Sequence, residues 1–190
     1  MLSVIIPTAG VEQTAVATLS ALVPGAAAGV VTEVLLVDRS PDPSVIERVA
    51  DVAGCHFMKF EGSHAAALAA GAAKARAPWL MFLPAGAVLD AGWIDETMQF
   101  VQSVAASGRP RAGIFRYARS PYAAISLRDR LRSVVRVLTG PLGDQGLLIA
   151  RDHYRQIGGY QPEHKRAEAL LLRRLGRTSR TMLRSRIVMV

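Results

Sequence analysis

The sequence of 190 residues contains a single cysteine, Cys55, which excludes an internal disulfide. It also lacks the Cys/His spacing of a zinc site. No apolar run approaches the ~20 residues that a membrane-spanning helix needs. The first residues, LSVIIPT, have neither the basic segment nor the long apolar core of a secretory signal. These absences favour a cytoplasmic protein in a reducing compartment.

Two common nucleotide-binding patterns are also missing. No G-x-G-x-x-G follows the first apolar run, and there is no G-x-x-x-x-G-K-[ST], so neither dinucleotide nor P-loop chemistry is indicated. Nucleotide binding by another arrangement of residues is still possible. Aromatic residues make up only 6% of the chain and do not interleave with the arginines as stacking platforms would, which argues against nucleic-acid binding.

The charge is divided along the chain. Residues 1–108 hold five Lys/Arg and ten Asp/Glu, a net charge of −5, whereas residues 109–190 hold eighteen and five, a net charge of +13. A basic half can bind nucleic acid, anionic lipid or a phosphorylated ligand, although solvated arginines in an Arg-rich proteome explain it equally well. The stretch Tyr122 to Leu138 has the pattern of an amphipathic basic helix, which is typical of a peripheral membrane contact or of a helix packed beside a site.

Short β-rich runs alternate with alanine-rich amphipathic stretches, a pattern that predicts a βαβ succession. Together they predict one α/β domain over residues 1–190, with a Rossmann-type, mostly parallel sheet flanked by helices. Its predicted strands are Leu2–Thr8, Thr32–Asp38, His56–Phe60 (an edge strand), Trp79–Leu83, Ala112–Ala118 and Leu147–Ala150. The predicted helices are Val11–Leu22, Ser44–Ala53 with Asp42 as N-cap, Ser63–Ala77, Asp90–Ser107 with Asp90 as N-cap, Tyr122–Leu138, Arg151–Gly159 and Glu168–Arg177.

In a doubly wound sheet, ligands bind beyond the carboxyl ends of the strands. This rule selects Pro7 and Thr8, Asp38, the start of the alanine-rich helix at Ser63 and His64, and the turn from Pro84 to Ala87. These four places could line one pocket.

Five stretches carry a resemblance to a known family. They are SVIIPT, EVLLVD with SPDPS, AAGAAKARAPWLMFLPA, GDQGLLIARDHYRQIGGY and LLRRLGR. In order and interval they resemble the family 2 glycosyltransferases of the GT-A fold, most closely a small bacterial branch, over about Leu2 to Val188. The resemblance implies transfer of a sugar from a nucleotide diphosphate sugar, most simply of the UDP type, to an unidentified acceptor.

The resemblance divides the chain into a nucleotide-binding half, about 1–108, and a basic acceptor-side half, about 109–190. The positions that it implies for nucleotide binding are Pro7, Thr8, Asp38, His64, Gly71 and Ala85. Asp38 could accept a hydrogen bond from the ring imide of uracil. Alternatively, Asp38 caps its own turn with Ser40, and Thr8 bonds its own backbone at the strand end.

The family expects an Asp-x-Asp pair that holds Mg²⁺ or Mn²⁺ after the fourth strand. Pro84 and Gly86 occupy those positions, so the metal ligands are absent. The nearest acid, Asp90, fits a helix N-cap better than a metal ligand.

The family also places a Glu-Asp pair before LLRRLGR, where one carboxylate deprotonates the acceptor hydroxyl. Without a gap, the pair aligns with His164 and Lys165; Glu163 and Glu168 flank this place. We take Glu163 and His164 as the candidate bases, because the pKa of an imidazole lies near neutrality. An exposed loop histidine would look the same.

Two further segments can be compared with the family: the start of the alanine-rich helix departs from it, and the loop GDQG agrees with it. At the start of the alanine-rich helix, His64, Ala67 and Ala69 replace polar residues that reach the ribose and phosphate, although His64 could still help to bind an anion. The loop GDQG is retained, which implies that Asp144 and Gln145 lie on the acceptor side.

Three functional hypotheses follow. The first is a diverged glycosyltransferase in which arginines such as Arg128, Arg132 or Arg151 replace the metal. The second is a non-catalytic pseudo-glycosyltransferase that binds nucleotides or a partner. The third is a membrane-surface protein that uses the segment Tyr122 to Leu138.

Overall fold

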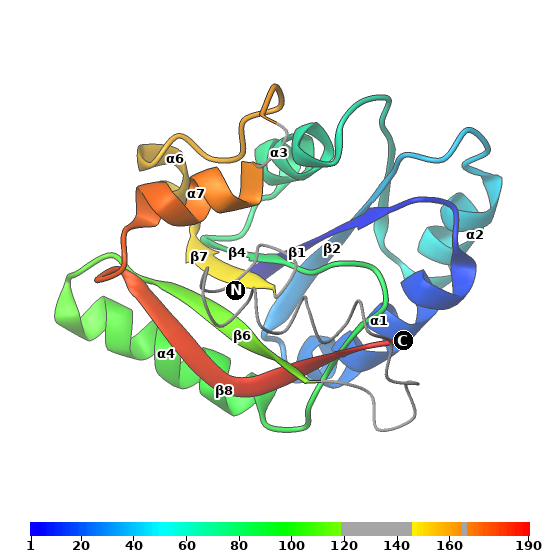
Figure 1. Cartoon of the computed structure of the whole chain (residues 1–190). Coiled ribbons are helices and arrows are strands. Elements are labelled where there is room, and N and C mark those ends of the chain that lie inside the picture. The colour runs from blue at the N-terminus through cyan, green and yellow to red at the C-terminus, as the bar shows by residue number, and fades with distance from the viewer. Residues whose placement is uncertain (119–145, 165–166) are drawn as a thin grey trace, which may run out of the picture.

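The computed structural model describes residues 1–118, 146–164 and 167–190 (Figure 1). Its strands are β1 (Leu2–Thr8), β2 (Val31–Asp38), β3 (His56–Lys59), β4 (Trp79–Phe82), β5 (Ala87–Leu89), β6 (Ala112–Ala118), β7 (Leu147–Ala150) and β8 (Arg180–Met189). Its helices are α1 (Glu12–Ala27), α2 (Ser44–Ala53), α3 (His64–Lys74), α4 (Trp93–Ser107), α6 (Arg151–Gln156) and α7 (Ala167–Leu175). The predicted helix Tyr122–Leu138 and the loop residues Asp144 and Gln145 lie outside the described residues.

The strands of the described residues form one sheet in the order β3-β2-β1-β4-β7-β6-β8-β5. The first four strands are parallel, as the βαβ pattern predicts. Strand β7 runs antiparallel to both β4 and β6, and β8 runs parallel to β6 but antiparallel to β5. The predicted α/β class with flanking helices is confirmed, and the predicted edge position of β3 is correct. The second half of the sheet is mixed.

Helices cover both faces of the sheet (Figure 1). Apolar side chains of α1, α2 and α4 pack in one core cluster, and those of α3, α6 and α7 pack in the other. Strand β1 is completely buried and divides its side chains between the two clusters, with Val4 and Ile6 on one side and Ile5 on the other. Its unbroken apolar run therefore reflects a central strand that is covered on both faces.

Helix α3 packs closely against β1 because, apart from Leu68, its buried residues are alanines and a glycine. A Cβ atom on Gly71 would lie 2.6 Å from Cγ2 of Ile5, so a larger side chain there would push the helix away from the sheet. The alanines around it, including Ala67 and Ala72, are buried. This close approach brings α3 beside β1 and β2.

Two predicted N-caps are wrong. Helix α2 has Pro43 at its N-cap position, and Asp42, one residue earlier, accepts a hydrogen bond from the Ser44 N–H at 3.0 Å. Helix α4 begins at Trp93 after Gly92. Asp90 lies at the end of β5, where its Oδ2 accepts a hydrogen bond from the Arg186 N–H of β8 at 3.0 Å. A partner distant in sequence thus replaces the local cap.

Among the described residues, no helix has the length and apolar character needed to cross a membrane.

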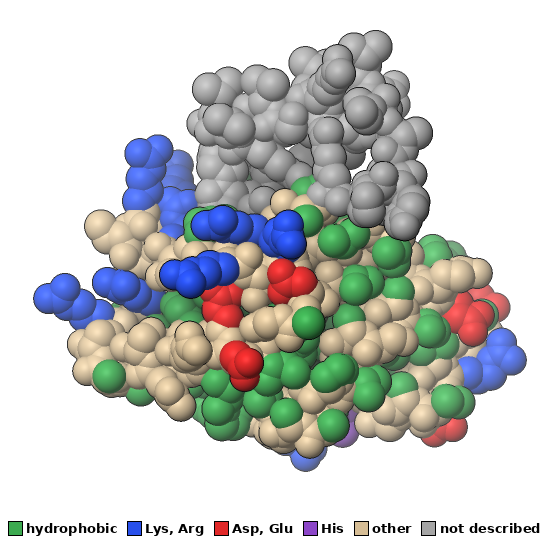
Figure 2. All heavy atoms as spheres, turned by 90° about the horizontal axis from the view of Figure 1, so that it is seen from below, with side chains coloured by type: hydrophobic (Ala, Val, Ile, Leu, Met, Phe, Trp, Pro, Cys, Tyr) green, Lys and Arg blue, Asp and Glu red, His purple; other side chains and the backbone are tan. Residues whose placement is uncertain are grey.

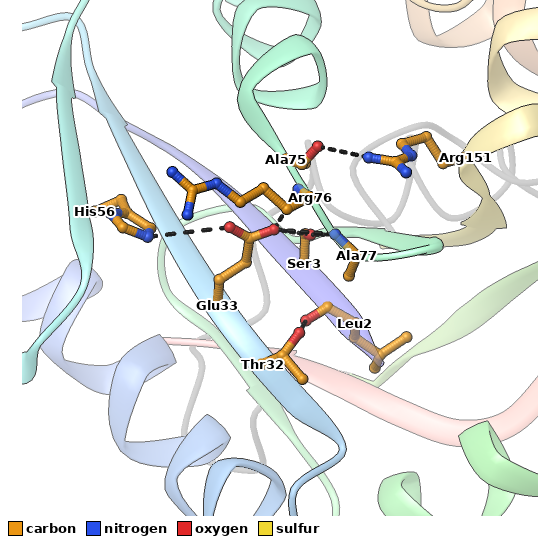
Figure 3. A network of polar contacts seen from close by, with 9 residues as sticks. All are labelled: Leu2, Ser3, Thr32, Glu33, His56, Ala75, Arg76, Ala77 and Arg151. Carbon is orange, nitrogen blue, oxygen red and sulfur yellow. Dashed lines mark hydrogen bonds and ion pairs between the residues drawn. The ribbon is translucent and has the colours of Figure 1, made fainter.

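A partly buried polar cluster joins the strands at the edge of the sheet where β1, β2 and β4 begin, the amino-end edge (Figure 3). The Glu33 carboxylate accepts hydrogen bonds from the Ser3 hydroxyl and from the backbone N–H groups of Arg76 and Ala77. His56 Nε2 lies 4.0 Å from the other carboxylate oxygen. Burial alone would raise the pKa of Glu33, but these hydrogen bonds lower it below its ordinary value.

Candidate functional site

The candidate site lies at the opposite edge of the sheet, where β1 to β4 end, the carboxyl-end edge. Thr8 and Asp38 are the last residues of two neighbouring parallel strands and are paired in register. The turn from Pro84 to Gly86 follows β4, and α3 begins at His64 close by. The topology therefore brings together the four places that the strand-end rule selects.

Asp38 is fully buried and is the centre of a small polar network. Its Oδ1 accepts hydrogen bonds from the Thr8 hydroxyl at 2.8 Å and from the Gly10 N–H at 3.1 Å. Its Oδ2 accepts one from the Ser40 hydroxyl, which is the turn contact considered as the alternative role of Asp38. A carboxylate offers about four acceptor positions, so these three donors leave one unused. Its role in binding a nucleotide base stays a prediction.

His64 begins α3 and connects it to α7. The Ser63 hydroxyl caps the helix by accepting from the Ala66 N–H at 3.1 Å and donates to the Pro162 carbonyl at 2.9 Å. His64 Nε2 lies 3.5 Å from Oε1 of Glu168, a residue in the first turn of α7. Residues from the first and the second half of the chain thus meet at this pair.

The surroundings of His64 favour its neutral form. Partial burial lowers its pKa, the positive charge of Arg39 lowers it further, and the carboxylate of Glu168 opposes both effects. Arg39 follows β2, is exposed, and donates from Nε to the Gly62 carbonyl at 3.1 Å. A bound anion would shift this balance towards the protonated imidazole.

Glu168 also borders a small cavity whose walls include Tyr160, Leu147 and Leu171. Its volume is about 10 Å³, close to the least space that a single water molecule needs. The cavity cannot hold a sugar. Burial raises the pKa of Tyr160, so this phenol stays protonated and is no candidate base. The other ionisable residue at the cavity wall is Glu168. Its side chain is 28% exposed, so a ligand can reach this carboxylate.

The predicted bases Glu163 and His164 lie in an exposed turn before α7. The His164 N–H donates to the Gln161 carbonyl at 3.3 Å, which closes the turn. Their catalytic role stays a prediction, but the contact with His64 is made by Glu168. In the sequence alignment without a gap, Glu168 only flanks the positions of the expected pair. The spacing of the buried residues Ala167, Leu171 and Leu175 could have placed Glu168 at the rim of the buried face of α7.

The other predicted positions are distributed as follows. Pro7 lies in buried β1 and pairs with Val37, while Gly71 packs against the sheet and Ala85 lies partly buried in the turn after β4. Their contacts with a nucleotide stay predictions. Arg151, considered as a replacement for the metal, lies at the amino-end edge because β7 runs antiparallel to β4, and its Nη1 donates to the Ala75 carbonyl at 3.0 Å.

The residues at the expected metal position do not fit a divalent cation. Neither Pro84 nor Gly86 has a side-chain ligand, and within residues 1–118, 146–164 and 167–190 no three His, Cys, Asp or Glu side chains cluster closely enough to hold a metal ion. The backbone of Gly86 is also occupied: its N–H donates to the Thr14 carbonyl and to Thr18 Oγ1, both at 2.9 Å.

No protein-family model matches the sequence, and no curated protein is significantly similar to it. Solved structures are nevertheless similar to it. One is the mannosyltransferase PcManGT from Pyrobaculum calidifontis in complex with GDP-Man and Mn²⁺, with a TM-score of 0.68 at 18% identity, over 98% of this chain and 56% of that one. Another is glucosyl-3-phosphoglycerate synthase from Mycobacterium tuberculosis with Mn²⁺, UDP and glucosyl-3-phosphoglycerate, with a TM-score of 0.65 at 15% identity, over 100% and 70% of the two chains.

A third similar structure is residues 1–349 of S. aureus TarS, with a TM-score of 0.63 at 13% identity, over 99% of this chain and 57% of that one. The chain thus spans between about half and about two thirds of the length of these structures. Such identities establish a shared fold and not a shared activity. The strand order, the two helical layers and these similarities together show that the chain has the GT-A glycosyltransferase fold.

Proposed function

We propose that the chain is a nucleotide-sugar glycosyltransferase related to family 2 that has diverged at its metal and base positions. The observation that carries the proposal is the contact between His64 and Glu168, with Nε2 and Oε1 3.5 Å apart. It gives the carboxyl-end edge an accessible carboxylate on the acceptor side. Nucleotide binding at this edge agrees with the GT-A fold, whose solved examples hold GDP-Man or UDP.

We propose a UDP-type donor. The uracil imide would donate to the remaining acceptor position of Asp38, next to Thr8 at the ends of β1 and β2. The network of Thr8, Gly10 and Ser40 would hold this carboxylate in a fixed orientation. Because Asp38 is fully buried, the base can approach only if the Ser40 turn moves aside.

In the proposed reaction, Glu168 accepts the proton of an acceptor hydroxyl while the hydroxyl oxygen bonds to the anomeric carbon of the sugar. The bond from that carbon to the diphosphate oxygen breaks, and the nucleoside diphosphate leaves with the bonding electrons. Arg39 and the protonated form of His64 would stabilise the charge that develops on this leaving group. Both flank the start of α3, where the helix dipole also favours an anion.

The test compares Glu168→Gln with Glu163→Gln, which removes the other candidate carboxylate base, in the exposed turn before α7. If Glu168 is the base, Glu168→Gln lowers the rate of sugar transfer from UDP-sugars by about 100-fold or more, while UDP affinity changes little. Glu163→Gln leaves the rate nearly unchanged. Transfer would be followed by release of UDP from a panel of UDP-sugars and acceptors. Equal effects of both substitutions would contradict the assignment.

The alternative is a non-catalytic protein that binds nucleotides. The misfit at Pro84 and Gly86 favours it, because a metal pair is one of the parts that such a protein would lose. UDP binding by the wild-type chain without transfer to any acceptor would support this alternative. A failure to bind UDP, GDP or CDP would contradict both forms of the proposal.

We further propose a peripheral contact with an anionic membrane. The turn before β6 carries Arg109 and Arg111, and it lies beside the start of β8 with Arg177 and Arg180, because Ala112 pairs with Arg180. Among the described residues, these arginines form no salt bridge. In the view of Figure 2, most Lys and Arg side chains lie towards the left, Asp and Glu side chains lie near the centre and at the right, and hydrophobic side chains are most numerous from the centre to the right. Each arginine near an anionic surface contributes about 1 kcal/mol.

This contact is tested by flotation with vesicles of phosphatidylcholine, alone or mixed with phosphatidylglycerol. Wild type should float only with the anionic vesicles, and the double variant Arg109→Glu/Arg111→Glu should float less. Equal flotation of the wild-type chain with both kinds of vesicle would contradict an electrostatic contact.

A further inference from the structure

The turn after β4 is where the fold would place a metal ligand, and the backbone groups of Pro84 and Gly86 in this turn already have hydrogen-bond partners. Strand β4 is extended by a hydrogen bond from the Leu83 N–H to the Ile5 carbonyl at 3.1 Å. The turn is then closed by the Ala87 N–H, which donates to the Pro84 carbonyl at 3.2 Å. No carbonyl of Pro84 or Gly86 is left without a partner, since the Gly86 carbonyl accepts from the Val190 N–H at 3.1 Å.

The N–H of Gly86 points into the molecule. It donates to the Thr14 carbonyl and to the hydroxyl oxygen of Thr18, a residue of α1 that is fully buried. Breaking this contact would leave a buried donor unsatisfied, which costs about 1–3 kcal/mol in folded proteins. Gly86 is therefore a connection between the turn, α1 and β8.

The space around Gly86 is also filled. Its φ is +91°, a backbone conformation that residues with a side chain rarely adopt. A Cβ atom there would lie 3.0 Å from the Val190 carbonyl oxygen and 3.4 Å from Cε of Met189. Strand β8 causes this crowding, because it pairs with β5 from Ala87 opposite Met189 onwards. An aspartate at 86 would require both the turn and the end of β8 to move.

The nearby acids are committed to the same strand. Asp90 accepts from the Arg186 N–H and forms a salt bridge with the Arg186 side chain at 3.8 Å. Glu96 of α4 accepts from the N–H groups of Arg184 and Ser185, at 2.5 and 2.6 Å. Asp90 and Glu96 thus both accept hydrogen bonds from the backbone of β8.

We infer that β8 closes the metal position of this fold, so that the chain binds its nucleotide without a divalent cation after β4 and cannot regain that cation by restoring the two acids. The part about the nucleotide rests on the proposed function. The part about residues 84–86 does not, since it concerns only how the turn is built. This separates the present chain from the similar structures that contain Mn²⁺.

The first experiment measures UDP affinity by calorimetry with Mn²⁺ and with EDTA. The two Kd values should agree within about twofold, and an increase in affinity of about tenfold or more with Mn²⁺ would overturn the inference. If UDP does not bind at all, the proposed function fails.

The inference about the turn is then decided by a titration of Mn²⁺ alone, followed by its electron paramagnetic resonance signal. Saturable binding of one Mn²⁺ that Pro84→Ala alters would overturn it, and an unchanged free-ion signal would support it.

The second experiment uses Pro84→Asp/Gly86→Asp, with Pro84→Asp and Gly86→Ala as controls. Both variants at position 86 should unfold at least about 3 °C below wild type, because the crowding acts on any Cβ atom. Pro84→Asp alone should unfold close to wild type. Neither the double variant nor Pro84→Asp should gain stability with Mn²⁺. If the double variant is as stable as wild type, or gains several degrees with Mn²⁺, the position is open and the inference is wrong.

Discussion

The two edges of the sheet each contain an acid of β2, the partly buried Glu33 near its start and the buried Asp38 at its end, but these acids are used differently. At the amino-end edge, Glu33 accepts from two backbone N–H groups of the segment that follows α3, and from Ser3. At the carboxyl-end edge, Asp38 accepts from the hydroxyls of Thr8 and Ser40 and from one turn N–H. A hydroxyl can rotate to another partner, whereas a backbone N–H is fixed by the fold. The hydrogen bonds of Glu33 therefore hold neighbouring segments of the fold together, whereas those of Asp38 can be rearranged when a ligand binds.

The two edges also differ in their histidine–carboxylate pairs, His56 with Glu33 and His64 with Glu168. His56 and Glu33 lie on neighbouring strands of the same parallel sheet, 4.0 Å apart, and are 61% and 10% exposed, so in this pair the carboxylate is nearly enclosed. His64 and Glu168 come from two helices and are 47% and 28% exposed. Partly exposed side chains from different elements can change partners at little cost, since water replaces the lost contact. We therefore expect ligand chemistry at the carboxyl-end edge and a structural role at the amino-end edge.

The largest expected effect is at the amino-end edge. Glu33→Ala removes the acceptor of three donors and should lower the free energy of unfolding by about 3 kcal/mol, because hydrogen bonds to a charged group are strong and the stranded donors are partly buried. Urea denaturation measures the effect. Glu61→Ala is the matched control, since Glu61 is 89% exposed and should change stability by less than about 0.5 kcal/mol. A loss below about 1 kcal/mol in Glu33→Ala would remove the contrast between the edges.

The contribution of Glu33 to stability should also depend on pH. The pKa of Glu33 is lower in the folded chain than its ordinary value, so its contribution is complete above the ordinary pKa and disappears as the pH falls through the folded value. The stability of wild type should therefore fall more steeply than that of Glu33→Ala below about pH 4.5. Parallel curves for the two proteins would contradict the assignment.

An intermediate effect is expected for Asp38→Asn. The amide nitrogen cannot accept, so one of the three donors loses its partner, and stability should fall by about 1–2 kcal/mol. The affinity for UDP should fall by about tenfold as well, because an amide oxygen is a weaker acceptor than a carboxylate. Calorimetry and urea denaturation separate the two changes. A loss of stability with unchanged UDP affinity would make Asp38 as structural as Glu33.

The smallest effect is expected for His64→Gln. The pKa of His64 is lowered in the folded chain, so the unfolded chain binds more protons and the stability of wild type should decrease as the pH falls below about 6.5. His153, whose pKa burial also lowers, contributes in the same direction, so the comparison is between wild type and His64→Gln. The variant should show the shallower decrease, with a difference of no more than about 0.5 kcal/mol because the residue is partly exposed. A steeper decrease would mean that the contact with Glu168 outweighs burial.

Local patterns in the sequence were sufficient for the parallel half of the fold. The runs that became β1, β2 and β4 are apolar and separated by amphipathic stretches, and the adjacency of Thr8 and Asp38 follows from both residues ending parallel strands. The N-cap predicted at Asp90 failed because its partner, Arg186, lies in a strand that is far away in the sequence. No local rule identifies such a partner.

The second half was harder for two physical reasons. Strand β5 has only three residues and exists because β8 pairs with it, so it has no periodicity of its own. Strand β8 does have a signal, the alternation of buried Leu183, Ser185 and Ile187 with exposed Arg184 and Arg186, which period-two analysis could have used. The contact of Glu168 with His64 depends on how α7 packs against α3, and spacing alone does not give it.

Strand β8 also has a consequence for how the chain folds. It pairs with β6 and β5, and it is held by Asp90 and Glu96, all of which lie much earlier in the sequence. Contacts between distant residues require the closure of long loops and form slowly. We expect β1 to β4 to assemble first and β8 to join in a later, slower step. The turn at residues 84–86 would reach its final structure only then, so its ordering reports the end of folding.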